Sequence, residues 1–121
     1  MDCIFCKINS KEINAYTIYE DEIVNVFLDV NPNSNGHTLI IPKKHFLDLQ
    51  EIDEETLTHI FKIAKKIQKL LEEKLKIDGL TLIQNNGEVQ EVKHYHLHLV
   101  PYYKTKQEKL TPEEVYKIIT K

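Results

Sequence analysis

Apolar and polar residues in the first third of the chain are arranged in a way that predicts three strands. Residues 15–20 and 23–29 are rich in β-branched and aromatic residues, and an acidic pair between them indicates a tight turn. Residues 30–36 are rich in Asn, Pro, Ser and Gly, which is typical of a loop. Residues 38–41 form a short apolar run that Pro42 ends, so we expect a buried strand there.

The middle of the chain has the periodicity of one long amphipathic helix. Asp53 suits the N-cap position, and apolar residues follow it at spacings of three and four. They are Leu57, Ile60, Phe61, Ala64, Ile67, Leu71 and Leu75. The pattern predicts a helix of about six turns that ends before Asp78 and Gly79.

Two further strands and a short helix complete the predicted order. Residues 80–83 form an apolar run that a polar loop follows, and residues 94–100 alternate strictly until Pro101. Thr111, followed by Pro and two Glu, is a favourable helix start. We therefore expect an α+β fold: an antiparallel sheet of about five strands, one long helix and a short C-terminal helix.

The domain organisation follows from the same pattern. Neither an internal repeat nor a low-complexity linker divides the chain. We expect one domain over residues 1–110, followed by a C-terminal helix and lysine-rich tail over residues 111–121.

Composition fits a globular domain in the cytoplasm. The 121 residues are 41% hydrophobic and 29% charged, which argues against disorder. Apolar runs stay well below the ~20 residues that a membrane span needs, and a signal-peptide pattern is not seen. We expect a cytoplasmic protein without a membrane partner.

Charge and cysteine content narrow the chemistry. The formal net charge is -3 and every cation among the 16 Lys+Arg is a lysine, which argues against nucleic acid as a partner. The two cysteines are Cys3 and Cys6. This C-x-x-C spacing is too sparse for a disulfide framework and suggests metal or redox chemistry in a reducing compartment.

Three histidines share one face of the strand predicted at residues 94–100. Side chains alternate along a strand, so His94, His96 and His98 point one way, and Tyr95 and the leucines point the other. The simplest interpretation is a solvated polar face. A single metal bound by all three is disfavoured, because positions i and i+4 of a strand lie roughly 13 Å apart and a metal–nitrogen bond is about 2.1 Å.

A third interpretation gives the three imidazoles different roles. A central histidine can act as nucleophile or base, because its pKa lies near neutrality and its two nitrogens are distinct. A neighbour on one side can donate a proton or hold an anion, and the neighbour on the other side can be structural. Since the chain has no Arg, His98, backbone N–H groups and neutral amides would have to meet the charge of a phosphoryl group.

The motif HYHLHLV at 94–100 resembles the signature of the histidine triad (HIT) family. Other stretches resemble segments of this family in the same order, namely Cys3–Ile8, Glu20–Asp29, Gly36–His45, Asn85–Glu88 and Gln90–Val92. The resemblance extends over nearly the whole chain and is greatest to the Hint and bacterial HIT branches.

The resemblance implies a homodimer that binds a nucleoside monophosphate unit, with a purine as the expected base, and cleaves its phosphorus linkage. His96 is then the nucleophile that forms a nucleotidyl-imidazole, His98 contacts the phosphoryl oxygens and leaving group, and His37 supports them. The implied nucleotide-binding residues are Asp29, Asn85, Gln90, Phe5, Ile8 and Leu28, with Ile4 and Phe27 beside the base. From the residues alone, Asp29 and Asn85 can also be turn residues.

The loop before the triad departs from the family pattern. Val89 alone stands between Asn-Gly-Glu and Gln-Glu-Val, where the family usually has about three residues. This shortening puts the phosphate contacts of Gln90 in doubt. The chain also has no aromatic C-terminal motif, so the substrate preference of Hint-type relatives is not carried over.

The family resemblance also implies a structural zinc site. Some HIT proteins bind zinc through a C-x-x-C pair, a histidine from the "P-K-x-H" segment and the first histidine of the triad. The corresponding residues are Cys3, Cys6, His45 and His94. Two buried small residues or a redox pair remain alternatives for the cysteines.

We expect a nucleotide hydrolase or transferase that cleaves a nucleoside 5'-phosphoryl linkage, with a P–N bond as the first choice. The alternatives are a dinucleoside polyphosphate hydrolase and a purine-nucleotide binding or scaffold protein with little catalysis. A zinc redox module is disfavoured, because it leaves the histidine triad without a role.

Overall fold

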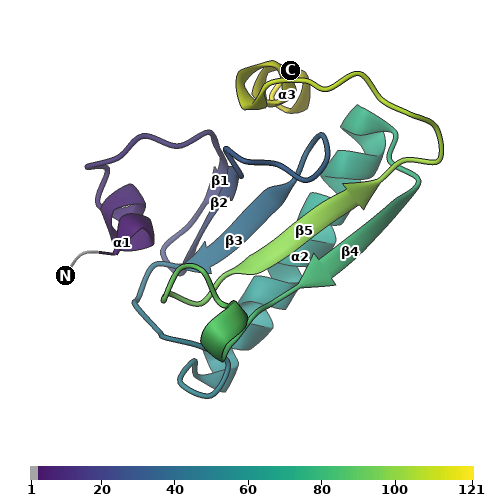
Figure 1. The fold of residues 1–121 in the computed structure, drawn as a ribbon. Coiled ribbons are helices and arrows are strands. Elements are labelled where there is room, and N and C mark those ends of the chain that lie inside the picture. The colour runs from purple at the N-terminus through teal and green to yellow at the C-terminus, as the bar shows by residue number, and fades with distance from the viewer. Residues whose placement is uncertain (1–2) are drawn as a thin grey trace.

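The computed structural model describes residues 3–121 and has an α+β fold (Figure 1). In chain order the elements are α1 (Ile4–Asn9), β1 (Thr17–Glu20), β2 (Val24–Leu28), β3 (Thr38–Pro42), α2 (Glu54–Leu75), β4 (Gly79–Ile83), the 3-10 turn η1 (Gly87–Val89), β5 (Leu97–Tyr102) and α3 (Pro112–Ile119). The predicted antiparallel sheet, long helix and short final helix are confirmed.

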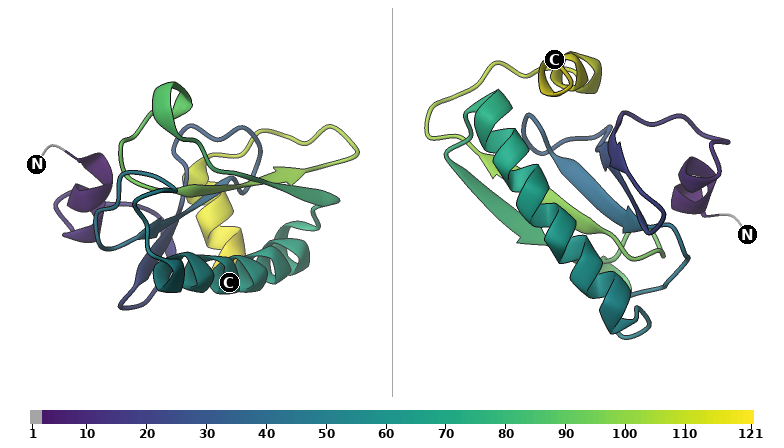
Figure 2. Two further views of the ribbon diagram at one scale, coloured as in Figure 1. Left: turned by 90° about the horizontal axis from the view of Figure 1, so that it is seen from below. Right: turned by 180° about the vertical axis from the view of Figure 1, so that it is seen from behind.

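One sheet of five strands organises the molecule. The strand order is β1-β2-β3-β5-β4, and each neighbouring pair is antiparallel. Helix α2 runs along one face of this sheet, and α1 and η1 lie toward the other (Figure 2). The central strands β2 and β3 are buried throughout, whereas β4 forms an edge with an exposed end.

The core lies between the sheet and α2. Helix α2 presents Ile60, Ile63, Ala64, Ile67 and Leu71 to the sheet, as its three- and four-residue spacing predicts. Strand β5 contributes Leu97 and Leu99 to this core, and Tyr95 joins them from the preceding segment. Burial of this apolar surface is the main force that holds the helix on the sheet.

The C-terminal helix belongs to the same core. Thr111 and Glu114 form a reciprocal capping box that begins α3. Val115 and Ile119 are buried in the cluster that contains the α2 side chains. Residues 111–121 are therefore packed on the domain rather than forming a detached tail.

The structure differs from the sequence prediction at two places that matter for the site. Residues 4–9 form helix α1, which the sequence did not lead us to expect. The last strand was predicted over 94–100 but runs from Leu97 to Tyr102, so His94 and His96 lie before it. The register that pairs Ile40 with Leu97 would bring Ile41 opposite His96 and then Pro42 opposite Tyr95, and Pro42 has no N–H for the ladder.

Pro101 was expected to end this strand but lies inside it. Its carbonyl oxygen accepts a hydrogen bond from the Ser34 hydroxyl at 2.6 Å, so this residue directs its backbone polar groups away from β4. The ladder with β3 already stops at the pairing of Thr38 with Leu99. The missing N–H of Pro101 therefore costs no ladder hydrogen bond.

Candidate active site and metal site

A cavity of about 520 Å³ opens on the sheet face away from α2. One row of side chains on this face crosses four strands, because the residues are paired in register. The row consists of Phe27 of β2, Leu39 of β3, His98 of β5 and Ile83 of β4. All four line the cavity, and Phe5 and Ile8 of α1 line it as well. Because α1 packs on Phe27 and Leu39, the cavity has an apolar wall facing the histidines.

The structure places five side chains of the histidine segment on the two sides that the sequence predicts. Tyr95, Leu97 and Leu99 pack in the core with α2. His96 and His98 line the cavity on the opposite side. His94 is fully buried and turns toward the cysteines instead.

His96 is held in a single orientation by the backbone of the segment that precedes β5. Its Nδ1 lies 2.8 Å from the carbonyl oxygen of His94. A carbonyl can only accept, so Nδ1 carries the proton and Nε2 keeps its lone pair. Burial lowers the pKa of His96, although the His94 carbonyl partly offsets this. The ring is therefore neutral at physiological pH, with a free nucleophilic nitrogen.

His37 and His98 form a directed hydrogen-bond chain. The Asn33 backbone N–H donates to His37 Nδ1 at 3.0 Å, so the proton of this ring lies on Nε2. His37 Nε2 lies 3.0 Å from His98 Nδ1, which must therefore accept. The proton of a neutral His98 then lies on Nε2. This assignment gives the cavity a free donor on His98 beside the free acceptor on His96.

Asp29 stabilises a turn and also lies in the site, so both of the possibilities that the sequence left open are seen. One carboxylate oxygen accepts the Asn31 backbone N–H at 2.8 Å, as in an Asx turn. The other lies 3.6 Å from His37 Nε2. This carboxylate also lines the cavity, so it supports His37 and faces any bound molecule.

The other predicted nucleotide-binding residues differ in placement. Asn85, Phe5, Ile8, Leu28 and Ile4 line the cavity. Leu28 also packs in the core with α2. Gln90 does not line the cavity: it is buried, and its side chain donates to the Leu47 carbonyl at 2.7 Å.

Sequence reasoning missed several contributors to the site, and three of them bear on its chemistry. Glu91 and Val92 line the cavity just after Gln90, and Asn33 fixes the His37 tautomer through its backbone. Glu91 stood in the segment already matched to the loop before the triad, so its charge was the available signal. A backbone N–H leaves no trace in residue identity, and the role of Asn33 could not be found that way.

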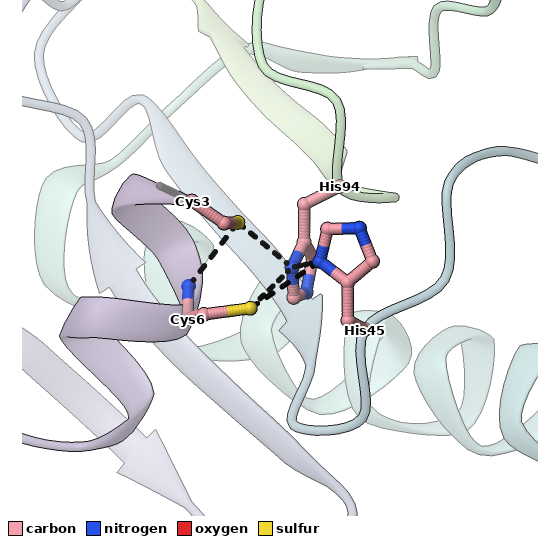
Figure 3. Close-up of side chains that lie close together, drawn as sticks. All are labelled: Cys3, Cys6, His45 and His94. Carbon is pink, nitrogen blue, oxygen red and sulfur yellow. Dashed lines mark hydrogen bonds between the residues drawn. The ribbon is translucent and has the colours of Figure 1, made fainter. Parts of the chain in front are cut away.

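Cys3, Cys6, His45 and His94 converge beside the cavity (Figure 3). Their four potential ligand atoms all lie within 4.8 Å of one another. The separations are 3.3 Å from Cys3 Sγ to His94 Nδ1, 3.3 Å from Cys6 Sγ to His45 Nδ1, and 3.1 Å between the two Nδ1 atoms. The four predicted metal ligands are therefore brought together.

The donor set fits a tetrahedral zinc ion. Zinc–sulfur and zinc–nitrogen bonds of about 2.3 and 2.1 Å imply ligand–ligand edges of roughly 3.3–3.8 Å, close to those observed. The Nε2–H of His94 donates to the Pro42 carbonyl at 2.9 Å, which leaves Nδ1 free for the metal. Burial lowers the pKa of His94 to about 4, so its ring is neutral.

A second cluster, formed by Asp29, His37 and His98, does not fit a metal in this way. Its potential ligand atoms also lie within 4.8 Å of one another. The Asn33 N–H, however, leaves the proton of His37 on Nε2, the atom that would face the ion. This cluster is a hydrogen-bond chain, and its geometry is explained without a cation.

Comparison with known proteins agrees with this architecture. The HIT domain family matches residues 10–105, and the chain belongs to that family. A HIT-like protein of Methanocaldococcus jannaschii is 48% identical over 84% of this chain and 79% of its own. The adenosine 5'-monophosphoramidase of Saccharomyces cerevisiae is 44% identical over 82% of this chain and 61% of its own.

Solved structures share the fold over nearly the whole chain. A histidine triad nucleotide-binding protein from Sulfolobus tokodaii is 36% identical with a TM-score of 0.88, covering 97% of this chain and 89% of that one. A zinc-bound histidine triad family protein from Mycobacterium smegmatis is 35% identical with a TM-score of 0.89, covering 98% and 91%.

The tautomers can be read by nitrogen NMR at neutral pH. We expect His96 to carry its proton on Nδ1, and His37 and His98 to carry theirs on Nε2. His98 should stay neutral until about pH 4, because burial and the neighbouring His96 and His37 lower its pKa to about 4. Protonation of His98 would remove the acceptor that His37 needs.

The lowered pKa of His98 makes the free energy of unfolding depend on pH. The unfolded chain takes up this proton near pH 6.5, before the folded chain does, so the free energy of unfolding should fall from about pH 6.5 toward pH 4. A His98 that titrates at or above pH 6.5, or that carries its neutral proton on Nδ1, would contradict the assigned chain.

Proposed function

We propose that this protein hydrolyses adenosine 5'-phosphoramidates through a covalent intermediate on His96. The observation that carries the proposal is the pairing of a free His96 Nε2 with a donating His98 Nε2 in one cavity. The family membership and the monophosphoramidase names of the relatives from Saccharomyces cerevisiae and Schizosaccharomyces pombe support it.

The reaction proceeds in two displacements at phosphorus. His96 Nε2 attacks, a P–N(histidine) bond forms, and the substrate P–N bond breaks. The amine leaves with that electron pair and takes up one proton from solvent, while the Nε2–H of His98 donates a hydrogen bond to the departing nitrogen. Water then attacks the nucleotidyl-His96, releases the nucleoside monophosphate and gives one proton back to solvent.

The hydrogen bond from His96 Nδ1 to the His94 carbonyl serves both displacements. It holds the ring in position for attack, and it stabilises the positive charge that the ring acquires when Nε2 becomes bonded to phosphorus. The carbonyl is fixed in place before the reaction, so little reorganisation is needed.

The surrounding residues provide the nucleotide site in this proposal. Phe5, Ile8 and Phe27 form an apolar wall that suits a purine base. Asp29 faces the cavity and can accept hydrogen bonds from ribose hydroxyls, and Asn85 can donate to the phosphate. Gln90 has no place in this site, because its amide is bonded to Leu47.

The Cys3, Cys6, His45 and His94 cluster holds a structural zinc ion in this proposal. All four ligands come from the protein, so the ion would cross-link α1 to the triad segment and have no open position for substrate. Free thiols that bind metal fit a reducing compartment, which supports the cytoplasm as the location.

A homodimer in this proposal forms along β4. This strand is the edge of the sheet, and its Leu82 and Ile83 are 42% and 38% exposed. Leu49, also exposed, lies beside the end of β4, where its N–H donates to Asn86 Oδ1 at 2.9 Å. An exposed apolar edge strand favours pairing with another chain.

In residues 3–121 the structure has no helix long and apolar enough to cross a membrane.

Replacement of His96 by Ala tests the catalytic proposal. Turnover of a fluorogenic adenosine phosphoramidate should fall by about a thousandfold or more, while AMP still binds. A nucleotidylated wild-type protein should be trapped by mass spectrometry. His59→Gln, which changes a histidine of α2, serves as the control and should keep full turnover.

The outcomes separate the candidate functions. Unchanged turnover in His96→Ala would refute the nucleophile assignment. A wild-type protein that binds AMP but hydrolyses no phosphoramidate would instead favour a nucleotide-binding role or hydrolysis of dinucleoside polyphosphates.

Metal analysis tests the zinc site. The zinc-reconstituted protein should hold one ion per chain, and Cys6→Ser should lose it, because a tetrahedral site loses a ligand. Chelation should lower the Tm by about 10 °C or more, which corresponds to roughly 2–3 kcal/mol. His59→Gln should retain its zinc. Full zinc content in Cys6→Ser would rule out this ligand set.

Sedimentation velocity tests the β4 interface. The wild-type protein should have twice the chain mass of 14.3 kDa. Leu82→Lys should shift it toward the monomer, because a charge in an apolar interface is costly to bury. Ile118→Lys introduces the same change at an exposed position of α3 and should leave the mass unchanged. A dimer unaffected by Leu82→Lys would place the interface elsewhere.

A further inference from the structure

The cavity has an unusual charge for a site that binds phosphate. The charged residues that line it are two carboxylates, Asp29 and Glu91, and among the described lining residues there is neither lysine nor arginine. His37 and His98 add no positive charge at neutral pH, because burial lowers the pKa of each. A ligand therefore meets hydrogen-bond donors and negative charge.

The two carboxylates differ in how they are used. Asp29 is engaged by the Asn31 N–H and by His37. The Glu91 side chain has neither a hydrogen bond nor an ion pair with any residue in 3–121, and it is exposed to the cavity solvent. Glu91 is thus the carboxylate that is free to contact a ligand.

The chain on both sides fixes the position of Glu91. Gln90 before it is buried and bonded to the Leu47 carbonyl. Val92 after it packs against the cluster that contains Phe5 and Phe27. The carboxylate therefore starts from an anchored backbone position at the cavity rather than from a free loop.

Glu91 shares the cavity with the proposed nucleophile. The side chains of Glu91 and His96 both line this cavity. A charged group on the departing amine of a substrate attacked by His96 therefore lies in the same cavity as the Glu91 carboxylate, where it is attracted or repelled according to its sign.

We propose that Glu91 selects the leaving group: phosphoramidates whose departing amine carries an additional positive charge are preferred over those with a neutral or anionic leaving group. This inference rests on the proposed function and adds to it the class of substrate. A cationic arm gains an ion pair with Glu91, and a carboxylate or polyphosphate arm is repelled by it.

The same reasoning separates this site from polyphosphate cleavage. The leaving group of a dinucleoside polyphosphate carries several negative charges, and the cavity lining presents no side-chain cation to receive them. Repulsion by Glu91 would raise the cost further. The inference therefore favours the P–N bond over the polyphosphate alternative.

Three adenosine 5'-phosphoramidates with arms of similar length test the inference. They carry an aminobutyl, a pentyl or a carboxybutyl group on nitrogen. We expect the kcat/KM of the aminobutyl compound to exceed that of the carboxybutyl compound by about tenfold. The ammonium group of the first is attracted to the Glu91 carboxylate and the carboxylate of the second is repelled by it, and solvent partly screens both interactions. The preference should weaken at high salt.

Substitutions at position 91 remove or reverse the charge that we propose selects the leaving group. Glu91→Gln should bring the three kcat/KM values close together, and Glu91→Lys should reverse their order. Glu88→Gln is the matched control, because Glu88 is a nearby exposed glutamate that does not line the cavity. It should leave the order and the values unchanged.

Binding measured in the His96→Ala background separates this inference from the proposed function. The dissociation constants of the three compounds need no turnover, and Glu91→Gln and Glu91→Lys should shift their order in the same way. Charge-dependent binding without turnover by the intact protein would uphold the role of Glu91 and refute the hydrolase.

Three results would overturn the inference. Arm preferences that are the same in wild type and in both Glu91 variants would show that the carboxylate does not select. An equal loss for all three compounds in Glu91→Gln would indicate a role in positioning alone. Failure of all three compounds to bind would refute this inference together with the proposed nucleotide site.

Discussion

The hydrogen bond from His96 Nδ1 to the His94 carbonyl is the interaction on which the site depends. It decides which nitrogen of His96 is free, and it does so without a second side chain. The carbonyl can serve this purpose only because the segment that carries it is itself fixed. Tyr95 N–H donates to the Phe46 carbonyl at 2.7 Å, and the His94 ring is bonded to Pro42. The reactive geometry thus rests on a backbone segment anchored to the chain that follows β3.

Burial of the imidazoles is the second constraint, and it explains how one short segment can hold three of them. Charged rings this close together would repel one another, but desolvation keeps His94 and His98 neutral, with pKa values of about 4. A neutral imidazole has one N–H that donates and one nitrogen that accepts. The hydrogen-bond partners of each ring therefore fix which of its nitrogens carries the proton. The cost is a cavity with no permanent positive charge, in which the orientation of N–H groups must do what lysine or arginine does in other phosphate sites.

The alternation of apolar residues was enough to predict the sheet, the long helix and the faces of the histidine segment. Tyr95, Leu97 and Leu99 face the core because the side-chain period of an extended chain holds even where the ladder is interrupted. The start of β5 was not predictable in the same way, because it depends on Pro42 in a partner strand. Helix α1 was missed because residues 4–9 form under two turns, which is too short a run for apolar spacing to predict a helix. Gln90 was matched by position to a phosphate contact, but the backbone path that turns its amide to Leu47 is a tertiary property.

The division of roles within the triad follows from where the strand begins. If the strand had started at residue 94 as predicted, the three rings would have formed one even row, and nothing in their geometry would have distinguished them. Because the ladder begins at Leu97, His94 turns away and joins Cys3, Cys6 and His45 behind the apolar wall formed by Phe5. Its ring then belongs to the cluster that can bind metal, while its carbonyl still orients His96. One residue therefore couples the two sites. A change in the cysteine cluster that moves the His94 backbone would also move the carbonyl that orients the His96 ring.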